Sequence, residues 1–298
     1  MVTMTTTLQD DVVAWYDRNG RDLPWREPAC GAWGVLVSEV MLQQTPVARV
    51  LPRWREWLAA WPEPADLALA PTADVLRAWD RLGYPRRALR LQECARAIVE
   101  RHGGAVPDDE AALRALPGIG EYTAAAVRAF AFGRRATVLD TNVRRVIARA
   151  VAGTALPPPH LSAVERERAA ALVPSDDHAA ARWAAASMEL GALVCTARSP
   201  RCEECPVVGR CVWNAAGLPP DEHAGRRRSQ GWHGTDRQVR GTVMALLRAH
   251  DAVAGPELVA RLRETLPTGL DAAQVERSLS GLVADGLAVL DGDRYRLP

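Results

Sequence analysis

The chain has 298 residues, of which 48% are hydrophobic and 24% are charged, and its formal net charge is only +1. This length allows two or three modest domains with real cores, and the composition is ordinary for a globular protein. Because the net charge is close to zero, overall basicity gives no reason to expect nucleic-acid binding. Only local clusters of basic residues could indicate it. No apolar run reaches membrane-spanning length and no signal sequence begins the chain, which predicts a cytoplasmic protein.

Apolar residues recur at three- and four-residue intervals through most of the chain, which predicts a mainly helical protein. In chain order the predicted helices span residues 7–19, 33–44, 47–61, 65–70, 73–82, 86–102, 109–115, 122–132, 141–151, 161–172 and 179–193. Between the first two, the segment Leu23 to Arg26 contains a proline and cannot stay helical. Its Trp25 and Arg26 are either a buried anchor beside a surface charge or, beside DNA, a stacking ring and a phosphate partner.

Glu39 lies inside the mostly apolar helix predicted at 33–44. It either faces solvent or lies in an apolar pocket with a raised pKa, ready to act as an acid. Gln43, Gln44 and Thr45 end this helix just before a proline. These polar residues either cap the helix or contact base edges and fill the gap left by an extruded base.

The predicted helix at 86–102 begins with several arginines. Arg86, Arg87 and Arg90 either face DNA or form an ordinary solvated helix start.

The sequence Leu-Pro-Gly-Ile-Gly, from Leu116 to Gly120, joins two short predicted helices. Gly118 and Gly120 can adopt backbone angles that other residues avoid, and they let the chain approach a ligand closely. The second helix begins with unpaired N–H groups, which form a ready site for a phosphate. The segment is therefore either a phosphate-binding hairpin or an ordinary corner between helices whose glycines serve only the turn.

Two further carboxylates stand in the second half of the chain. Asp140 lies between apolar residues and a basic run, twenty residues past the hairpin. Glu189 lies near the end of the helix predicted at 179–193. That helix runs directly into a group of cysteines.

Four of the six cysteines fall within seventeen residues: Cys195, Cys202, Cys205 and Cys211. In a cytosolic chain such a group favours a metal over disulfides. Zinc sites usually combine two Cys-x-x-Cys pairs, or one such pair with two histidines. One pair flanked by two single cysteines suits a cubane iron–sulfur cluster better, with structural zinc as the alternative.

The last part of the chain reads as a separate small unit. It contains helices predicted at 238–250, 255–264 and 271–284, then a hairpin of strands at 287–290 and 294–297. Three helices and a hairpin resemble a winged-helix module. Such a module either holds duplex DNA or binds a protein. In the first case the contacts would come from Arg277, Arg294 and Arg296, with the preceding run Arg226 to Arg228.

Five motifs in order give residues 8–216 a resemblance to the MutY-type adenine DNA glycosylases, which belong to the helix-hairpin-helix, endonuclease III superfamily. The motifs are Leu-Pro-Trp-Arg at 23–26, Ser-Glu-Val-Met-Leu-Gln-Gln-Thr at 38–45, Leu-Pro-Gly-Ile-Gly-Glu-Tyr-Thr at 116–123, Leu-Asp-Thr-Asn-Val-Arg-Arg at 139–145, and Glu-Leu-Gly-Ala-Leu-Val-Cys at 189–195 with the remaining cysteines. The cysteine spacing matches the 4Fe–4S loop of that family, which favours this cluster over zinc.

The resemblance implies an all-α core in the helix-hairpin-helix DNA glycosylase fold of two helical domains. The six-helix domain with the hairpin would span residues 28–137, and the iron–sulfur domain would combine residues 1–27 and 138–218. A linker at 219–235 and a winged-helix-like unit at 236–298 would follow. DNA would lie in the cleft where Glu39 and Asp140 meet.

The family's catalytic roles carry over to four residues here. Glu39 would protonate the adenine ring nitrogen, so that a neutral base departs. Asp140 would stabilise the oxocarbenium-like sugar, much as paired carboxylates divide the work in glycoside hydrolysis. Tyr122 and Asn142 would orient Asp140 and the water.

The implied partner is double-stranded DNA with a mismatch or lesion, bound by a monomer at the nucleoid. The pocket for the flipped base would be lined by Trp25, Arg26, Leu42 and Glu189. Gln44, between Gln43 and Thr45, would occupy the vacated place. Leu116, Gly118 and Gly120 would belong to the hairpin that holds a phosphate.

Tyr122 stands where strand-cleaving members of the superfamily carry a lysine, and all 37 basic residues of this chain are arginine. Without lysine no side-chain amine can form a Schiff base. This predicts a monofunctional glycosylase that removes adenine opposite 8-oxoguanine or guanine in base excision repair.

Two alternatives remain. Some thymine or uracil glycosylases acting on T·G or U·G mismatches also carry tyrosine there, although Glu39 with Gln43 to Thr45 favours adenine. A non-catalytic iron–sulfur DNA-binding protein is the alternative of another class, and the paired carboxylates argue against it.

The sequence departs from the family at three places. Pro85 stands where many relatives have a second aromatic residue, and Thr141 stands where glycine is common. The winged-helix-like unit replaces the long C-terminal domain with which typical members read 8-oxoguanine. The resemblance therefore does not extend to the domain with which typical members recognise the partner base.

Overall fold

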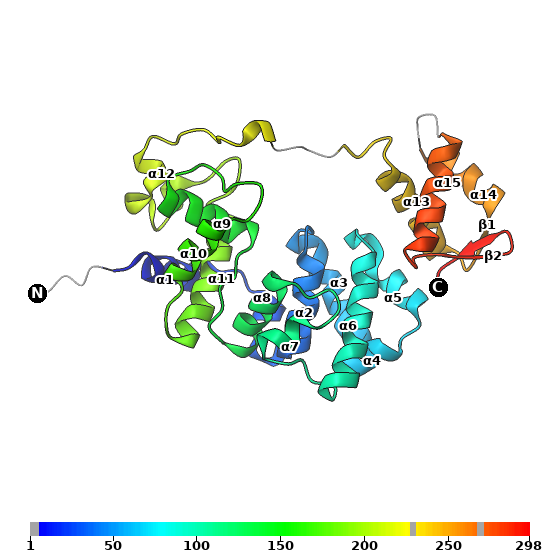
Figure 1. Cartoon of the computed structure of the whole chain (residues 1–298), viewed down its shortest axis with the longest axis horizontal. Helices are drawn as coiled ribbons and strands as arrows, with labels where there is room; N and C mark the ends of the chain where they lie inside the picture. Colours follow the sequence, from blue (N-terminus) through cyan, green and yellow to red (C-terminus); the bar gives the residue numbers. More distant parts are fainter. Residues whose placement is uncertain (1–5, 227–230, 267–270) are drawn as a thin grey trace, which may run out of the picture. The chain divides into compact units, whose positions relative to one another are not determined.

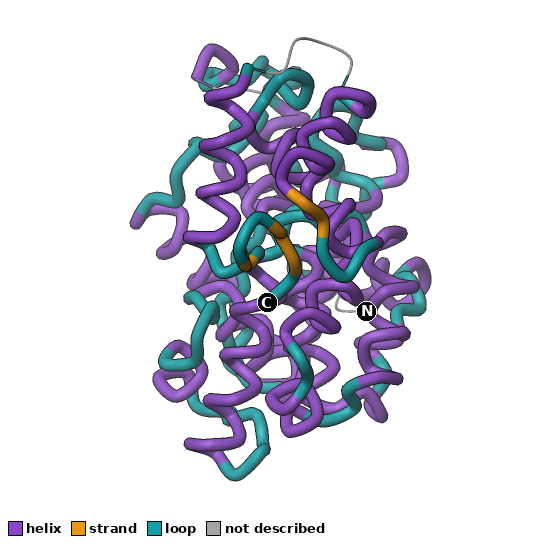
Figure 2. The backbone as a smooth tube through the Cα atoms, turned by 90° about the vertical axis from the view of Figure 1, so that its right-hand side faces the viewer, coloured by secondary structure: helices purple, strands orange, loops and turns teal. Residues whose placement is uncertain are grey.

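The computed structural model describes residues 6–226, 231–266 and 271–298. Contacts divide the chain into two compact units. Unit 1 comprises Met1–Leu36, Asp108–Ala115 and Ile119–Arg228. Unit 2 comprises Val37–Pro107, Leu116–Gly118 and Ser229–Pro298. The described part is mainly helical, with its strands near the C-terminus (Figures 1 and 2).

None of the described helices is both long and apolar enough to cross a membrane.

The helices of unit 1 come from three separate stretches of the chain. They are α1 (Leu8–Asn19), the first part of α2 (Gly31–Leu42), α7 (Glu110–Arg114), α8 (Glu121–Phe132), α9 (Thr141–Ile147) with a π-helical turn at Ala148–Ala152, α10 (Ala163–Leu172), α11 (Asp177–Leu193) and α12 (Val212–Ala215). Side chains cap several of these helices. Thr7 and Asp10 form a capping box at the start of α1, for example, and Asp176 caps α11.

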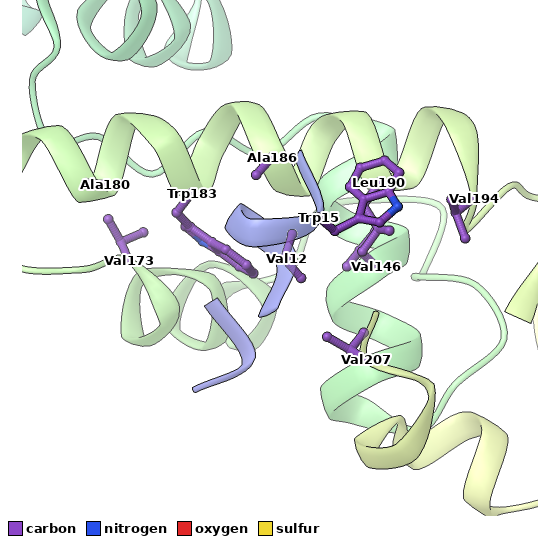
Figure 3. Packing of buried hydrophobic residues seen from close by; sticks show 10 residues of the cluster. All are labelled: Val12, Trp15, Val146, Val173, Ala180, Trp183, Ala186, Leu190, Val194 and Val207. Carbon is purple, nitrogen blue, oxygen red and sulfur yellow. The ribbon is translucent and has the colours of Figure 1, made fainter. Parts of the chain in front are cut away.

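The core of unit 1 lies where α1 and α9 pack against α11 (Figure 3). Trp15 of α1, Val146 of α9 and Trp183 of α11 belong to one buried cluster. The cluster also includes Val194, the C-cap of α11, and Val207 from the loop that carries the cysteines. Burying a large apolar side chain contributes roughly 1.5–3 kcal/mol. The same packing that stabilises unit 1 therefore fixes the helices that carry Asp140 and Glu189.

The described part of unit 2 contains the rest of α2 and four further helices before the C-terminal segment, with a 3₁₀ turn between two of them. These are α3 (Val47–Ala60), α4 (Pro64–Leu69), α5 (Thr72–Trp79), a 3₁₀ turn at Asp80–Leu82, and α6 (Arg86–His102). Every side chain of α2 from Trp33 to Met41 is buried. A helix without a polar face belongs to a protein interior rather than a surface.

The C-terminal segment of unit 2 has the element order of a winged helix. The elements are α13 (Asp236–Ala249), β1 (Val253–Ala254), α14 (Gly255–Thr265), α15 (Ala272–Ala284), β2 (Val289–Asp291) and β3 (Arg294–Arg296). The three strands are antiparallel in the order β1-β3-β2, with Tyr295 of β3 opposite both Val253 and Leu290. The predicted three helices and hairpin are thus confirmed. The two-residue β1 is too short to show an alternating pattern, and the sequence did not reveal it.

The predicted helices occur close to their expected bounds, with two differences. The helix expected at 73–82 ends at Trp79, because Asp80 adopts a positive φ of 42° and breaks the α-helical hydrogen bonding. The helix expected at 141–151 changes to π-helical geometry from Ala148. The four-residue α12 was not predicted. The domain bounds expected from the sequence stay a prediction.

Candidate functional site

Glu39 is buried, with an exposed fraction of 5%, on the central part of α2. Its helix neighbours Leu36, Val40 and Met41 are buried as well. The structure therefore decides against the solvent-facing alternative. A carboxyl group in such surroundings is the type of group that enzymes use as a general acid.

The residues after α2 divide into a buried and an exposed part. Thr45 is buried, and its hydroxyl donates a hydrogen bond to the carbonyl oxygen of Leu82 (3.0 Å). Gln44 is exposed and adopts a positive φ of 55°, which is uncommon for a residue with a side chain. Thr45 thus has a structural role, and Gln44 is presented outward.

Arg87 holds this turn in place, and the structure places it in neither of the two predicted environments. Its guanidinium donates to the carbonyl oxygens of Val40 (2.8 Å) and Met41 (3.0 Å), at the end of α2. It also donates to Leu82 O (3.0 Å) and to Thr45 Oγ1 (3.1 Å). Burial lowers the pKa of Arg87 to about 10. This arginine is an internal clamp rather than a solvated or DNA-facing charge.

The Leu-Pro-Gly-Ile-Gly segment joins α7 to α8 as predicted. Gly118 has a φ of 79°, and a Cβ added there would lie 3.0 Å from Arg90 Cβ, so this position needs glycine on both counts. Gly120 does not use the conformational freedom of a glycine, because its φ of −96° and ψ of −178° are open to any residue. Leu116 and Ile119 anchor the turn by burial.

Gly120 nevertheless leaves the start of α8 open. It is the N-cap of that helix and provides no side-chain acceptor for the first N–H groups. A Cβ added to Gly120 would meet no described atom within 4 Å. Both features fit the predicted phosphate site, which stays a prediction.

Asp140 is the N-cap of α9. Its Oδ1 accepts a hydrogen bond from the backbone N–H of Val143 (2.7 Å), and its Oδ2 accepts one from Nδ2 of Asn142 (2.7 Å). Burial raises the pKa of Asp140, while these hydrogen bonds and the charge of Arg145 oppose that rise. The structure thus places Asn142 in direct contact with Asp140, and the catalytic roles of these two residues stay a prediction.

Arg145 connects Asn142 to the cysteine loop. Its Nη2 donates to Oδ1 of Asn142 (2.7 Å) and to the carbonyl oxygen of Gly191 (2.7 Å), and its Nε donates to the carbonyl oxygen of Cys195 (2.6 Å). The guanidinium offers its donors in a rigid fork. A continuous chain of hydrogen bonds therefore runs from Asp140 through Asn142 and Arg145 to Cys195.

Arg149, one turn further along, is only 3% exposed and lies beside the first cysteine. It donates to the carbonyl oxygens of Ala155 (2.8 Å) and Thr196 (2.7 Å) and contacts Cys195 Sγ at 3.4 Å. Its guanidinium also lies 4.4 Å from the centroid of the Trp213 ring. A buried cation at this place offsets the negative charge of coordinating thiolates.

The four predicted cysteine ligands line one cavity, together with Arg149, Val194 and Trp213 among others. Among the described residues, no three His, Cys, Asp or Glu side chains gather around one point as they would for a single metal ion. In a 4Fe–4S cluster each cysteine binds a different iron, so the ligands surround a space. The shared cavity fits that arrangement.

Glu189, on α11, is 1% exposed and is bound by two arginines. Nε and Nη2 of Arg21 donate to its carboxylate oxygens (2.7 and 2.8 Å), and Nη2 of Arg26 donates to Oε2 (2.7 Å). Burial alone would raise the pKa of Glu189, but the hydrogen bonds from both arginines and the charge of Arg26 bring it to about 2. Arg26 and Glu189 therefore act as one ion pair beside the buried Trp25.

Tyr122 lies in the first turn of α8 and packs against a small cluster formed mainly by alanines. That cluster also contains Val138, two residues before Asp140, and Ala184 of α11.

Leu42 ends α2, and Gln43 is half-buried. The arrangement of the Glu39 part of the site relative to the Asp140 part stays a prediction, because these residues belong to different units.

Gly191 is a residue that the sequence reading missed. A Cβ added there would lie 2.7 Å from Asn142 Cβ and 2.8 Å from the carbonyl oxygen of Asn142. Backbone atoms cannot move aside as a flexible side chain can. We expect Gly191→Ala to lower the free energy of unfolding by about 1–3 kcal/mol, measured by chemical denaturation.

Gly225→Ala is the matched control, because a Cβ there would meet no described atom within 4 Å. If Gly191→Ala unfolds at the same denaturant concentration as the parent and this control, the close approach of α11 to α9 is not required for the fold.

Comparisons with known proteins agree with this geometry. Residues 37–170 match the HhH-GPD superfamily base excision DNA repair protein, and residues 195–211 match the iron–sulfur binding domain of endonuclease III. An adenine DNA glycosylase of Mycobacterium tuberculosis is 51% identical over 97% of this chain and 92% of its own. The chain belongs to the adenine DNA glycosylase family. The family and the helix-hairpin-helix fold predicted from the sequence are thereby confirmed, as is the iron–sulfur cofactor.

More distant matches include glycosylases of another specificity. A thymine/uracil-DNA glycosylase of Pyrobaculum aerophilum is 35% identical over 70% of this chain and 92% of its own. The solved structure of a thermostable thymine-DNA glycosylase superposes with a TM-score of 0.63 at 28% identity, over 70% of this chain and 95% of that one.

The 4Fe–4S cluster of this member of the adenine DNA glycosylase family predicts the metal and sulfide content of the purified protein. The purified protein should contain iron and acid-labile sulfide in about equal amounts, because a 4Fe–4S cluster holds both in that ratio. Elemental analysis and sulfide assay after anaerobic purification measure this. Cys202→Ser should lower cluster content and soluble yield, whereas Cys94→Ser, at a buried cysteine outside the loop, should keep the cluster. Stoichiometric zinc without iron would contradict the assignment.

Proposed function

We propose that this protein removes adenine paired with 8-oxoguanine or guanine from duplex DNA, as a monofunctional glycosylase of base excision repair. The observation that carries the proposal is the buried carboxyl group of Glu39, within a chain that is 51% identical to an adenine DNA glycosylase over nearly its whole length. A buried acid has no evident purpose in a protein that only binds phosphates. The same observation therefore disfavours a non-catalytic DNA-binding protein.

Glu39 supplies the proton in the proposed reaction. Adenine departs slowly as an anion, and protonation of a ring nitrogen lets it leave as a neutral base. A positioned carboxylic acid that gives this proton in the transition state contributes about 10²–10⁴-fold to the rate. The burial of Glu39 on α2 provides a site that excludes competing water.

Asp140 takes the opposite role and acts in its ionised form. As the glycosidic bond breaks, positive charge develops on the sugar, and a carboxylate nearby stabilises it. The hydrogen bonds from Asn142 and from the Val143 N–H favour that ionised form and fix its position. Arg145 fixes Asn142 in turn, so we assign Arg145 a positioning role. Tyr122 is the fourth proposed catalytic residue and, with Asn142, orients Asp140 and the water.

The flipped adenine is proposed to lie against Trp25, Leu42 and the ion pair of Arg26 with Glu189. Arg21 and Arg26 both bind the Glu189 carboxylate. The guanidinium of Arg26 is therefore part of the pocket wall and does not bind a phosphate. The exposed Gln44, with Gln43 beside it, fills the vacated place in the duplex. Backbone N–H groups at the start of α8 hold a phosphate.

The chemistry ends with an intact strand. Lysine is absent from the sequence, so no lysine amine is available to attack the sugar and break the backbone. The 4Fe–4S cluster supplies structural support to the loop from Cys195 to Cys211 when bound. We propose that the protein acts as a monomer on the nucleoid in the cytoplasm.

Removal of thymine or uracil from mismatches with guanine is the second candidate. The match to a thymine/uracil-DNA glycosylase at 35% identity favours it, as does the thymine-DNA glycosylase structure. That match covers less of this chain and is weaker than the match to the adenine enzyme.

A substrate panel separates the candidates. Single-turnover excision would be measured on otherwise identical duplexes with A·8-oxoG, A·G, T·G and U·G pairs, and with an A·T pair as the control. We expect release of adenine from the first two duplexes only. Excision confined to T·G and U·G would establish the second candidate. Binding of all duplexes with no base release would support the non-catalytic protein.

A further inference from the structure

The guanidinium of Arg237 lies beside two aromatic rings on the surface of unit 2. Arg237 is in the first turn of α13, and its Cζ lies 4.6 Å from the centroid of the Tyr84 ring and 5.5 Å from that of Trp232. Both distances are within the range of cation–π contacts. Tyr84 is 41% exposed and Trp232 is 47% exposed, so the group keeps aromatic surface open to solvent.

Tyr84 is held in a strained conformation by its neighbours. Its φ of 47° is uncommon for an aromatic residue, and the glycine before it also has a positive φ. Arg87 donates hydrogen bonds to the carbonyl oxygens of Leu82 and Gly83 (both 3.0 Å), and its own Cζ lies 5.7 Å from the Tyr84 ring. Such strain persists only where the surroundings enforce it, and it is typical of functional positions.

The winged-helix segment is fixed against the same part of unit 2. Nε of Arg248, on α13, donates to the carbonyl oxygen of Leu76, on α5, at 3.0 Å. Arg86 pairs with Asp285 at 3.3 Å. These contacts fix the last turn of α13 and the end of α15 against the rest of unit 2. The contacts of Arg237 with the Tyr84 and Trp232 rings then bring the three side chains of the group to one surface.

Most other arginines of the segment are bound to protein groups. Arg277 pairs with Asp236 (3.6 Å), Arg240 pairs with Asp285 (2.5 Å), and Arg294 donates to the carbonyl oxygen of Ala252 (3.2 Å). In the described ranges of the chain, Arg237 forms no ion pair with a carboxylate. Its charge is therefore available to a ligand, unlike the charge of Arg277, which the sequence favoured. Arg294 also keeps its charge, but the carbonyl oxygen of Ala252 holds its guanidinium in place.

Exposed rings next to an unneutralised arginine suit a ligand that has flat aromatic faces and negative charges. Nucleic acid has both, because bases stack on aromatic rings and phosphates bind guanidinium groups. We propose that Trp232 and Arg237, supported by Tyr84, form a platform through which the winged-helix segment contacts DNA. Trp232 takes the face of a base, and Arg237 takes the neighbouring phosphate. This inference rests on the proposed function, and it assigns the contact to the start of α13 rather than to the β2–β3 hairpin.

The two side chains have separable effects on DNA affinity. The full-length holoprotein would be titrated by fluorescence anisotropy with a duplex that carries a tetrahydrofuran abasic analogue opposite 8-oxoguanine, which the enzyme cannot process. Trp232→Leu should weaken binding about five- to tenfold, the lower part of the range for a lost stacking contact, without changing the salt dependence. Trp232→Phe should restore affinity to within about twofold of the parent, because it keeps a stacking ring.

Arg237→Gln should weaken binding and reduce the slope of log K against log salt by about one, because one phosphate contact is lost. Arg294→Gln is the matched control, since it removes the same charge from the same segment and should keep the slope. Arg77→Gln controls for docking, because Arg77 pairs with Asp251 of the segment (3.4 Å) away from the rings. It should bind as the parent does.

Parent-like binding by Trp232→Leu, or equal salt slopes for Arg237→Gln and Arg294→Gln, would overturn the platform. The outcome is independent of catalysis. If the variants weaken binding as expected while the parent releases no adenine from A·8-oxoG, the platform stands and the proposed function fails. If the parent excises adenine and all variants bind alike, the proposed function stands and the platform fails.

Discussion

Glu39→Gln should bind a duplex with an A·8-oxoG pair as tightly as the parent and excise adenine about 10²–10⁴-fold more slowly. Glutamine fills almost the same volume as glutamate on the buried face of α2, so the fold and the DNA contacts should persist. It has no proton of suitable acidity to give to the leaving base. Binding would be measured by anisotropy and excision by single-turnover kinetics, which separates the chemical step from affinity.

Glu189→Gln offers an informative comparison, because it changes another buried glutamate in the same way. Glu189 binds Arg21 and Arg26, so its loss should lower stability and affect affinity rather than remove a proton donor. Excision by Glu39→Gln at a rate near that of the parent would show that the acid is a different residue.

Asp140→Asn should fold normally and lose excision to a similar degree. Asparagine is as good an N-cap as aspartate, so the start of α9 should be preserved. The amide carries no charge to stabilise the developing cation on the sugar. Circular dichroism would confirm the fold, and single-turnover excision would measure the loss. Asp176→Asn, at the N-cap of α11, is the control and should keep both fold and activity.

The pKa of Asp140 should determine how the excision rate falls at low pH. Asp140 must be ionised to act, and burial raises the pKa of Asp140 above its ordinary value. The ionised fraction therefore falls as pH decreases through a pKa higher than 3.8, and excision should fall with it. A single-turnover pH profile measures this limb. A rate that stays constant down to the ordinary aspartate pKa would exclude Asp140 as the group that must be ionised.

The sequence allowed the cluster ligands and the hairpin to be predicted because both depend on local spacing. Four cysteines within one short loop need no knowledge of the fold, and Gly118 does adopt a left-handed conformation in its turn. Gly120 shows the limit of the same argument. The identity of a glycine says that unusual angles are allowed, but only the structure shows whether they are used.

The buried arginines could not be predicted in this way. The buried Arg145 and Arg149 and the half-buried Arg87 look like solvated charges in the sequence, since arginine is mostly exposed in proteins. Their burial depends on carbonyl oxygens that come together only in the folded chain. Arg145, for example, binds oxygens of Gly191 and Cys195, which lie 46 and 50 positions away. An i, i+4 pair of arginines just before an apolar run was the one available signal.

Gly191 was missed for a related reason. Within the predicted helix 179–193 a glycine only weakens helix propensity. The need for it arises from the approach of α9 and becomes visible only when Asn142 is placed against it. The helices and the hairpin of the winged-helix segment could likewise be predicted from their local sequence patterns. The contact of Arg237 with Tyr84 could not, because it joins residues 153 positions apart.

The most direct test of the account is an analysis of both products from one reaction on a 5′-labelled duplex with a single A·8-oxoG pair. Free adenine would be quantified by chromatography, and the labelled strand would be resolved on a denaturing gel before and after alkali. We expect one free adenine per reacted duplex, with the strand intact until alkali is added. Strand breaks that accumulate before alkali at the rate of base release, or an absence of free adenine, would contradict it.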